Sequence, residues 1–305
     1  MNSDQAVVDI HNVSRTFGDT TALSGVCLQI REKSLTGLIG ADGAGKTTLM
    51  RICTTLDQQY EGAVTVLGLS TSIHKKQIRN RIGYMPQRFS LYSDLTVQEN
   101  LSFFADVYTL PADIRRTRIE RLLAFSRLEP FVDRKAGNLS GGMKQKLALS
   151  CALIHEPEVL LLDEPTVGVD PLSRQEFWSI LHDLHKNGTT IILSTPYMDE
   201  VEYCEDIVLL HQGTVLQTGT PREMIDEYPY NLYIIYTCAR IPDDLTLPQG
   251  IVHVYTTGGS VRIVADRQMS LQKVQDKIGE IFPGEKPVQP VRPDFEDVFI
   301  HALTP

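Results

Sequence analysis

A glycine-rich segment between a mostly apolar run and a helix-forming run constrains this 305-residue chain more than any other feature. The segment reads Gly40-Ala41-Asp42-Gly43-Ala44-Gly45-Lys46-Thr47. Residues 35–39 before it resemble a buried strand, and helix-forming residues begin at Thr48. This is the context of a P-loop, because glycines let backbone N–H groups and a helix N-terminus surround a phosphate. A tight turn with incidental glycines is the alternative, which the complete GxxxxGK[ST] pattern disfavours.

A pair of carboxylates forms the second element of the predicted site. Asp163 and Glu164 end the apolar run 159–162, which has the length of a buried strand. A buried parallel strand delivers its last side chains to the crevice where ligands bind in open α/β sheets. The alternative for this pair, taken alone, is the solvated end of a core strand.

The two elements together predict a site for ATP and Mg²⁺. Residues 40–48 are expected to hold the phosphates, with Lys46 reaching the β- and γ-phosphates. Thr47 and Asp163 are expected to bind Mg²⁺. Glu164 is then the group that orients and deprotonates the attacking water.

A third motif lies between these elements, at Leu139-Ser140-Gly141-Gly142-Met143. Here the sequence resembles the ATP-binding subunits of ABC transporters, whose signature is LSGG[MQ]. Ser140 and the amides of Gly141 and Gly142, at a helix N-terminus, make a second anion site. In that family this site closes on the γ-phosphate bound by the other subunit, so ATP joins a head-to-tail dimer. Taken alone, the motif is equally explained as a loop with a helix N-cap.

The resemblance covers essentially the whole chain and implies roles for further residues. Phe17 matches the aromatic residue on which adenine stacks, although a half-buried strand residue is the plain alternative. Gln87 matches the glutamine that contacts Mg²⁺ and the attacking water. Asp170 matches a loop that crosses the dimer interface. Asp170-Pro171 is also typical of a helix N-cap with proline at the first helical position, and the two roles are compatible.

The chain departs from the family pattern inside the P-loop. Ala41 and Asp42 stand where the family usually has proline and asparagine, and Asp42 brings a negative charge near the anion. Because the glycines and Lys46 remain, we expect phosphate binding to be retained.

A second departure follows the apolar run 190–195. Pro196 stands where the family carries a histidine that touches the γ-phosphate. Proline has neither a side-chain donor nor a backbone N–H. The hypothesis is that this ATP site binds nucleotide but hydrolyses it slowly. The first half of tandem-ATPase efflux proteins, which the chain resembles in Asp42 and in the lost histidine, pairs with a second ATPase, so a heterodimer is favoured over a homodimer.

Composition narrows the possible partners and the compartment. The net charge is −9, which argues against a broad nucleic-acid footprint. No apolar run is long enough to span a bilayer, and residues 1–5 lack a basic and apolar signal segment. The five cysteines lack CxxC spacing, which indicates reduced packing residues of a cytosolic protein. They are Cys27, Cys53, Cys151, Cys204 and Cys238.

The pattern of the chain predicts two domains. We expect an α/β P-loop NTPase core in residues 1–229, with a mostly parallel sheet, a small antiparallel sheet and a helical subdomain over about 88–150 that carries the signature. Residues 230–305 are expected to form a small α+β accessory domain. Expected strands cover 7–13, 63–67, 189–195, 207–211, 214–217, 233–237, 252–256 and 261–265. Expected helices cover 97–108, 113–125, 143–153, 173–185 and 271–281.

The end of the chain, residues 292–300, resembles the terminal helix of export-type (ABC-2) ATPases. In those proteins the appendix helps two subunits dimerise. The apolar stripe of Phe295, Val298 and Phe299 is equally explained as an ordinary core face.

The resulting hypothesis is an ATPase subunit at the cytoplasmic face of a membrane, peripheral through a separate export permease. In the family, the surface between Gln87 and Glu99 docks a permease helix. Here that surface offers Phe89, Leu91, Tyr92 and Leu95, some of which use in the folding core explains as well. The rival functions are a soluble ABC ATPase that remodels ribosomes or DNA, and an ATP-gated regulatory subunit with little turnover. No residue of the chain indicates the transported substrate.

Overall fold

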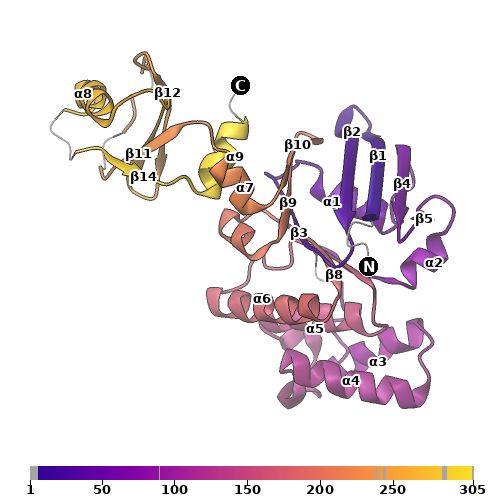
Figure 1. The fold of residues 1–305 in the computed structure, drawn as a ribbon. Helices are drawn as coiled ribbons and strands as arrows, with labels where there is room; N and C mark the ends of the chain where they lie inside the picture. Colours follow the sequence, from indigo (N-terminus) through magenta and orange to yellow (C-terminus); the bar gives the residue numbers. More distant parts are fainter. Residues whose placement is uncertain (1–5, 89, 238–239, 243–244, 284–286, 304–305) are drawn as a thin grey trace. The chain divides into compact units, whose positions relative to one another are not determined.

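The chain divides into two compact units, residues 1–221 and 222–305. The structure is a computed structural model that describes residues 6–88, 90–237, 240–242, 245–283 and 287–303. Figure 1 shows the order of the elements along the chain. By contacts the division comes before 229/230, because the helix α7 (Pro221–Asp226) belongs almost wholly to the second unit. The domain boundary at 229/230 therefore stays a prediction.

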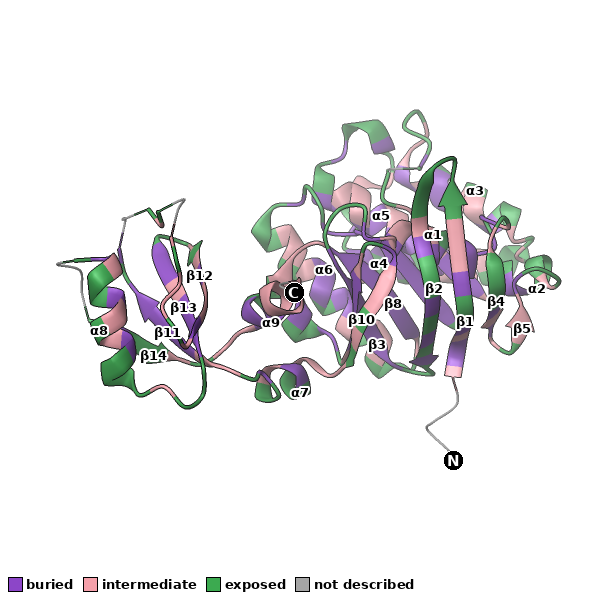
Figure 2. Ribbon diagram, turned by 90° about the horizontal axis from the view of Figure 1, so that it is seen from above, coloured by how far each residue is buried: buried purple, intermediate pink, exposed green. Residues whose placement is uncertain are grey.

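The first unit is built on a sheet with the strand order β10-β9-β3-β8-β7-β6. From β9 to β6 each neighbouring pair is parallel, and the β9–β10 hairpin is antiparallel. Every residue of β3, β7 and β8 is buried, as expected for parallel strands that are covered on both faces. Figure 2 shows buried residues along β8. The strands are β3 (Leu35–Ile39), β6 (Ile82–Met85), β7 (Val159–Asp163), β8 (Thr190–Thr195), β9 (Asp206–His211) and β10 (Thr214–Gly219).

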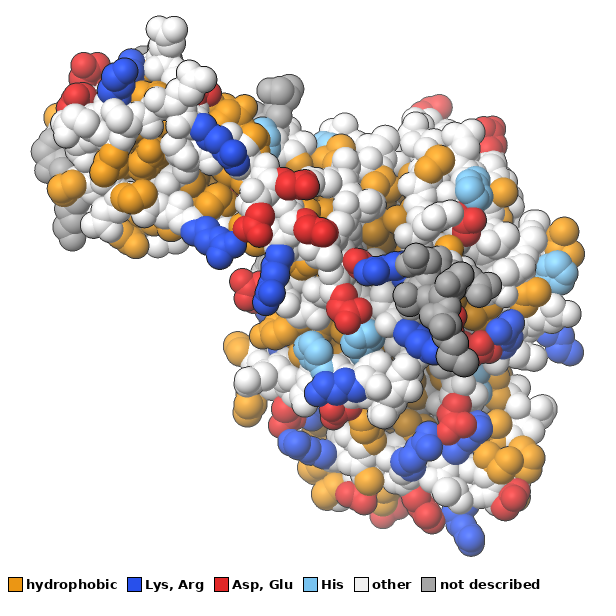
Figure 3. All heavy atoms as spheres, in the orientation of Figure 1, with side chains coloured by type: hydrophobic (Ala, Val, Ile, Leu, Met, Phe, Trp, Pro, Cys, Tyr) orange, Lys and Arg blue, Asp and Glu red, His pale blue; other side chains and the backbone are white. Residues whose placement is uncertain are grey.

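Helices dominate the predicted helical subdomain. The α-helices are α3 (Val97–Val107), α4 (Ala112–Ser126) and α5 (Gly141–Leu153), with the short 3-10 helices η1 (Glu129–Phe131) and η2 (Ala136–Asn138). Thr96 and Glu99 start α3 with a reciprocal capping box. Figure 3 shows acidic and basic side chains mixed over this part of the surface. Arg118 and Arg121 of α4 both pair with Glu156. The expected helices are thus present, each within about two residues of its predicted ends.

An antiparallel sheet with the order β2-β1-β4-β5 forms the second layer of this unit. Its strands are β1 (Ala6–Phe17), β2 (Thr20–Arg31), β4 (Glu61–Val66) and β5 (Leu69–Ser70). The sequence suggested short strands here, but β1 and β2 are each 12 residues long. Register shifts, such as the one between Ile10 and Val13, interrupt the alternation of apolar and polar residues. This interruption is why the pattern showed β1 only in part and β2 not at all.

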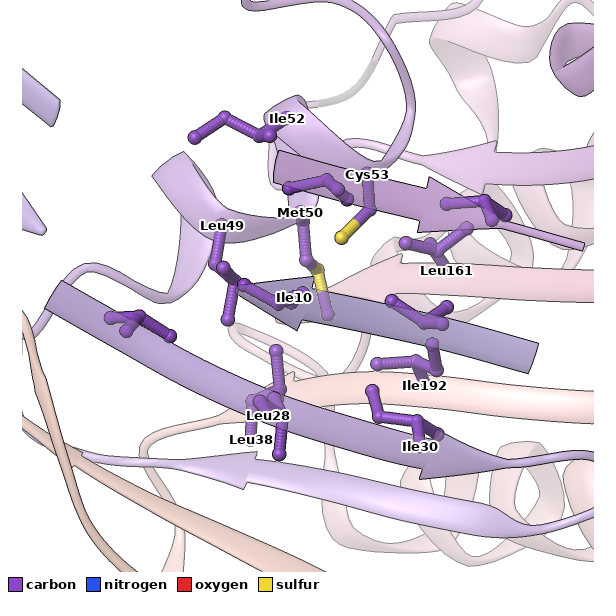
Figure 4. Packing of buried hydrophobic residues seen from close by; sticks show 14 of the residues in the cluster. Ile10, Leu28, Ile30, Leu38, Leu49, Met50, Ile52, Cys53, Leu161 and Ile192 are labelled. Carbon is purple, nitrogen blue, oxygen red and sulfur yellow. The ribbon is translucent and has the colours of Figure 1, made fainter. Parts of the chain in front are cut away.

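The main core lies between the two sheets and the helix α1 (Lys46–Cys53). Figure 4 shows Leu49 and Met50 of this helix pointing toward Ile10 of the antiparallel sheet. Leu161 and Ile192 join the same cluster from the parallel sheet. The P-loop helix is therefore held by apolar contacts to both layers. The unit also contains α2 (Lys75–Arg79), α6 (Pro171–Lys186) and η3 (Met198–Tyr203).

The second unit is an antiparallel sheet with the order β12-β13-β11-β14. Its elements are β11 (Asn231–Ile235), β12 (Ile251–Thr257), β13 (Ser260–Ala265), α8 (Leu271–Ile281), β14 (Gln289–Val291) and α9 (Phe295–Leu303). Val274 and Ile278 of α8 pack with Ile263 of the sheet, as their helical spacing predicted. This confirms the predicted α+β appendix.

The terminal helix α9 is tied to its own sheet by charge. Asp297 is buried, accepts hydrogen bonds from Tyr255 and Arg262, and Arg262 also pairs with Asp294. Phe295 and Val298 are buried as well. The apolar stripe is thus a core face in the described chain, and a role of the appendix in dimerisation stays a prediction.

Candidate functional site

The P-loop lies between β3 and α1, as expected, and its backbone leaves no room for side chains at two glycines. A Cβ atom on Gly40 would lie 2.3 Å from the Leu210 carbonyl oxygen. A Cβ atom on Gly45, which has a φ of +107°, would lie 2.6 Å from the Ala22 carbonyl oxygen. Only glycine permits these close approaches, so the loop can wrap tightly enough to point its N–H groups at an anion.

Lys46 closes the loop from inside. It is the first residue of α1 and is buried, with 4% of its surface exposed. Its Nζ donates to the carbonyl oxygens of Gly40 at 2.8 Å and Ala41 at 3.2 Å. The buried ammonium group of Lys46 is thus held against the first two residues of the P-loop. Asp42 is exposed at the turn, so its charge is screened by solvent.

Asp163, the last residue of β7, gathers hydroxyl groups from two other elements. Its Oδ1 accepts from Thr47 Oγ1 at 3.0 Å and from Ser194 Oγ at 2.7 Å. Its Oδ2 is buried and has no hydrogen-bond partner within the described residues. A buried, unpartnered carboxylate oxygen beside a threonine hydroxyl fits a hard cation such as Mg²⁺.

Glu164 is the point where three predicted residues meet. Its Oε2 accepts from Gln87 Nε2 at 2.6 Å, and its Oε1 lies 3.6 Å from Lys46 Nζ. The backbone of Glu164 is left-handed, with a φ of +49°, and its N–H donates to Ser194 Oγ at 2.9 Å. Such strain in a non-glycine residue concentrates at functional sites. The structure therefore brings Lys46, Thr47, Gln87, Asp163 and Glu164 together.

Sequence reasoning missed two residues next to Asp163. Ser194 bonds both to Asp163 and to the Glu164 backbone. Burial, and then the nearby Asp163 carboxylate, raise the pKa of the Tyr84 phenol, which stays protonated at neutral pH. A signal was available in principle, because Tyr84 and Ser194 lie near the ends of strands that neighbour β7 in the sheet.

The signature lies on a separate element of the unit. Ser140 is the N-cap of α5 and accepts from the Met143 N–H at 3.3 Å, which confirms the N-cap interpretation. Gly142 is buried against Ser173 at the start of α6. No hydrogen bond among the described residues joins Ser140 to the P-loop. Its contact with a nucleotide on another subunit stays a prediction.

Asp170 and Phe17 occupy exposed positions. Asp170 is the N-cap of α6 and accepts from the Ser173 N–H at 3.0 Å, an interaction that lowers the pKa of its carboxyl group. This confirms the N-cap interpretation, while the role at a dimer interface stays a prediction. Phe17 ends β1 with 49% of its surface exposed, which leaves a ring face available for stacking.

The expected docking surface is only partly apolar in the described residues. Leu91 is buried and Leu95 half-buried, so use in the folding core accounts for them. Tyr92 is exposed and contacts the Phe103 ring edge-on, with centroids 4.6 Å apart. Phe89 lies outside the described residues, as does Cys238.

The segment after β8 carries Pro196 and is packed by a buried acid. Glu200 is fully buried and accepts from Thr195 Oγ1 at 2.5 Å. The guanidinium of Arg174 lies 3.7 Å from the other Glu200 oxygen and 4.2 Å from the centroid of the Tyr197 ring. The position of Pro196 is therefore well supported, although proline itself offers no donor.

Comparison with known proteins decides the family. A family described as "ABC transporter" matches residues 23–167. The Nod factor export ATP-binding protein I of Burkholderia orbicola is 36% identical over 222 residues, which cover 72% of this chain and 73% of that protein. The chain belongs to the ATP-binding proteins of ABC transporters. It carries an ABC-type ATPase cassette, as the P-loop and signature predicted.

Further relatives extend this assignment. The probable multidrug ABC transporter ATP-binding protein YbhF of Escherichia coli is 38% identical over 307 residues. The match covers 98% of this chain and 52% of YbhF, so the chain spans about half the length of that relative. The ATP-binding cassette MJ0796, in a dimeric post-hydrolysis structure with ADP and Pi, is 29% identical with a TM-score of 0.64, over 70% of this chain and 98% of that one. The structural likeness confirms the predicted α/β fold, and the two relatives are themselves named for multidrug transport and for Nod factor export.

Among the described residues, none forms a helix with the length and apolar character needed to traverse a membrane.

Proposed function

We propose that this chain binds MgATP and hydrolyses it as one ATP-binding subunit of an exporter, with a separate membrane permease and a second ATPase as partners. The observation that carries the proposal is the convergence of Lys46, Gln87 and Glu164 beside the P-loop. Proline occupies position 196, the switch position at which the family carries its histidine. Supporting it, two relatives are named as multidrug and Nod factor export proteins.

The chemistry follows from the groups that converge. Lys46 would neutralise charge on the β- and γ-phosphates, because its ammonium group already lies inside the loop. Glu164, held by Gln87, would accept a proton from the attacking water. Thr47, Asp163 and Gln87 would hold Mg²⁺, which when bound neutralises developing charge on the phosphate oxygens.

Pro196 makes the site of this chain slow. A preorganised donor to the transition state typically contributes on the order of 10²–10³ in rate, and proline cannot supply one. Two copies of this chain would form two handicapped sites. A partner ATPase with histidine at the position that corresponds to Pro196 would use the Ser140 to Gly142 signature of this chain to complete a fast site. This advantage supports a heterodimer.

The location follows from the partners. A cassette that drives export acts where its permease presents a cytoplasmic surface, so we place the chain peripherally at the cytoplasmic face of the membrane. The exposed Tyr92 and Phe103 supply an apolar patch suited to an amphipathic helix of the permease.

The test compares ATP turnover by the purified chain with turnover by the chain mixed with a second ABC ATPase that carries histidine at the switch position. We expect slow turnover by the lone chain, faster turnover by the pair, and an increase on the order of 10² when Pro196→His is introduced into the lone chain. The control is Pro248→His in the second unit, which should change neither rate. Vigorous turnover by the lone chain, unaffected by Pro196→His, would refute the slow-site proposal.

A further inference from the structure

Arg15 lies directly against the ring of Phe17. The two residues are two positions apart on β1, so their side chains emerge on the same face of the strand. The Arg15 guanidinium carbon is 3.9 Å from the centroid of the Phe17 ring, which is the geometry of a cation–π contact. One face of the half-exposed ring is therefore covered by a cation within the chain itself.

All three guanidinium nitrogens of Arg15 are held in place. Nε donates to Asp57 Oδ2 at 2.8 Å, Nη1 to the Thr16 carbonyl at 2.9 Å, and Nη2 to Gln59 Oε1 at 3.3 Å. Only 12% of the Arg15 side chain is exposed. Burial alone would raise the pKa of Asp57, but the Gln59 N–H and Arg15 together lower it, so the ion pair persists at neutral pH.

These contacts link the aromatic ring to both ends of the P-loop helix. Asp57 follows α1, and its N–H donates to the Arg51 carbonyl at 3.0 Å. At the other end, Phe17 pairs with Thr20 at the tip of the β1–β2 hairpin, near Ala22, whose carbonyl closely approaches Gly45 of the P-loop. Arg15 is thus fixed against one face of an aromatic ring, on a hairpin that reaches the P-loop at Gly45.

We propose that Arg15 is a positioning residue for the nucleotide base, because it covers one face of Phe17 and fixes the ring with its other face presented to adenine. The inference rests on the proposed function, which takes Phe17 as the surface on which adenine stacks. It makes two demands. Arg15 must matter for ligands that contain a base and not for the phosphates alone, and its planar shape must matter as well as its charge.

The experiment is a calorimetric titration with MgATP and with magnesium tripolyphosphate, which has the phosphates but no base. Phe17→Ala should weaken MgATP binding roughly tenfold, the scale of one base stacked on an aromatic residue. Arg15→Met should weaken it roughly three- to tenfold. Neither change should alter tripolyphosphate binding. The matched control is Arg31→Met, which removes an arginine of β2 that pairs with Asp206 of β9 and should change the binding of neither ligand.

Three further variants test whether the effect of Arg15 depends on its planar shape, on charge balance and on Phe17. Arg15→Lys keeps the positive charge but loses the planar guanidinium group, so it should bind MgATP as weakly as Arg15→Met. Because Arg15→Met leaves the buried Asp57 without its cation, the double variant Arg15→Met/Asp57→Asn restores charge balance and should show the same loss of MgATP affinity. The double variant Arg15→Met/Phe17→Ala should bind MgATP no more weakly than Phe17→Ala alone, since the Arg15 guanidinium acts through the Phe17 ring.

The outcomes distinguish failure of this inference from failure of the proposed function. Unchanged MgATP affinity in Phe17→Ala would contradict the proposal that adenine stacks on Phe17, and so this part of the proposed function. A loss in Phe17→Ala with none in the Arg15 variants would overturn the role of Arg15 alone. Equal losses for MgATP and tripolyphosphate in Arg15→Met, or a parent-like Arg15→Lys, would reduce Arg15 to a general attractive charge and also overturn it.

Discussion

Strands β7 and β8 are neighbours in the central sheet, with Asp163 in register with Ser194, yet the chain continues differently from their ends. After β7 comes Glu164, buried, strained at a φ of +49° and within reach of Lys46 and Gln87. Directly after Thr195, the last residue of β8, comes Pro196, which has neither a side-chain donor nor a backbone N–H. The first strand end carries the carboxylate that we propose as the catalytic base, whereas the second carries no donor at position 196.

The segment after β8 is nonetheless well packed. Glu200 is fully buried, accepts from Thr195 and lies beside Arg174, which also covers the Tyr197 ring. These contacts involve no residue at position 196. The difference between the two strand ends teaches that the residues that hold the shape of this segment are not the residue at position 196 itself, so packing here does not depend on whether that position carries a donor.

The largest expected effect breaks the reactive strand end. Glu164→Gln keeps the size and the hydrogen bond to Gln87 but cannot act as a base, so ATP turnover should fall on the order of 10²–10⁴-fold. Turnover is measured in the Pro196→His background, and ATP-dependent dimers are followed by size-exclusion chromatography, where we expect the variant to accumulate. Glu202→Gln, which changes an exposed acid of η3, is the control. Parent-like turnover in Glu164→Gln would show that another group is the base.

The next effect separates binding from hydrolysis. Lys46→Ala removes a buried, charge-assisted contact to phosphate, so MgATP binding should weaken by about 1.5–3 kcal/mol. Pro196→His should leave the same affinity nearly unchanged, because position 196 acts on the transition state. Calorimetry with MgATP measures both, and Lys186→Ala at an exposed helix end is the matched control. Undiminished binding in Lys46→Ala would contradict the P-loop assignment.

Much of this site was predictable because its motifs are local. The P-loop, the Asp163-Glu164 pair and the signature each combine special residues within a few positions, and buried parallel strands are visible as apolar runs. The partners of these motifs are distant in sequence. Ser194 beside Asp163 and Arg15 beneath Phe17 depend on strand register and on a long, bulged β1, which a pattern of alternation does not show.

A smaller effect tests the packing of the signature. A Cβ atom on Gly142 would lie 2.5 Å from Ser173, whereas one on Gly141 would lie 3.5 Å from the Gly168 carbonyl, an ordinary contact. Gly142→Ala should therefore destabilise the fold by about 1–3 kcal/mol through overpacking between α5 and α6. Gly141→Ala, its matched control, should be neutral or slightly stabilising, because alanine favours a helix. Chemical denaturation of both variants measures the difference, and equal midpoints would contradict the close contact.

The smallest effect sharpens the comparison at the second strand end. If Arg174 and Glu200 hold the shape of the segment, their removal matters only when position 196 carries a donor. Arg174→Met leaves the buried Glu200 without its cation and should loosen the segment. We expect it to lower the turnover of the Pro196→His chain roughly tenfold, since small displacements of a catalytic donor are costly. In the parent, position 196 carries no donor that Arg174 and Glu200 could position, so Arg174→Met should barely change the turnover.

Single-turnover ATP hydrolysis in the parent, Pro196→His, Arg174→Met and the double variant provides this comparison. Arg134→Met removes a similar arginine, stacked on Phe131 in the helical subdomain, and serves as the control. Equal fractional losses from Arg174→Met in both backgrounds would mean that Arg174 supports the whole unit. A loss confined to the Pro196→His background would show that Arg174 and Glu200 hold this segment in a shape that serves a donor at position 196. They would do so although the parent chain has proline at that position.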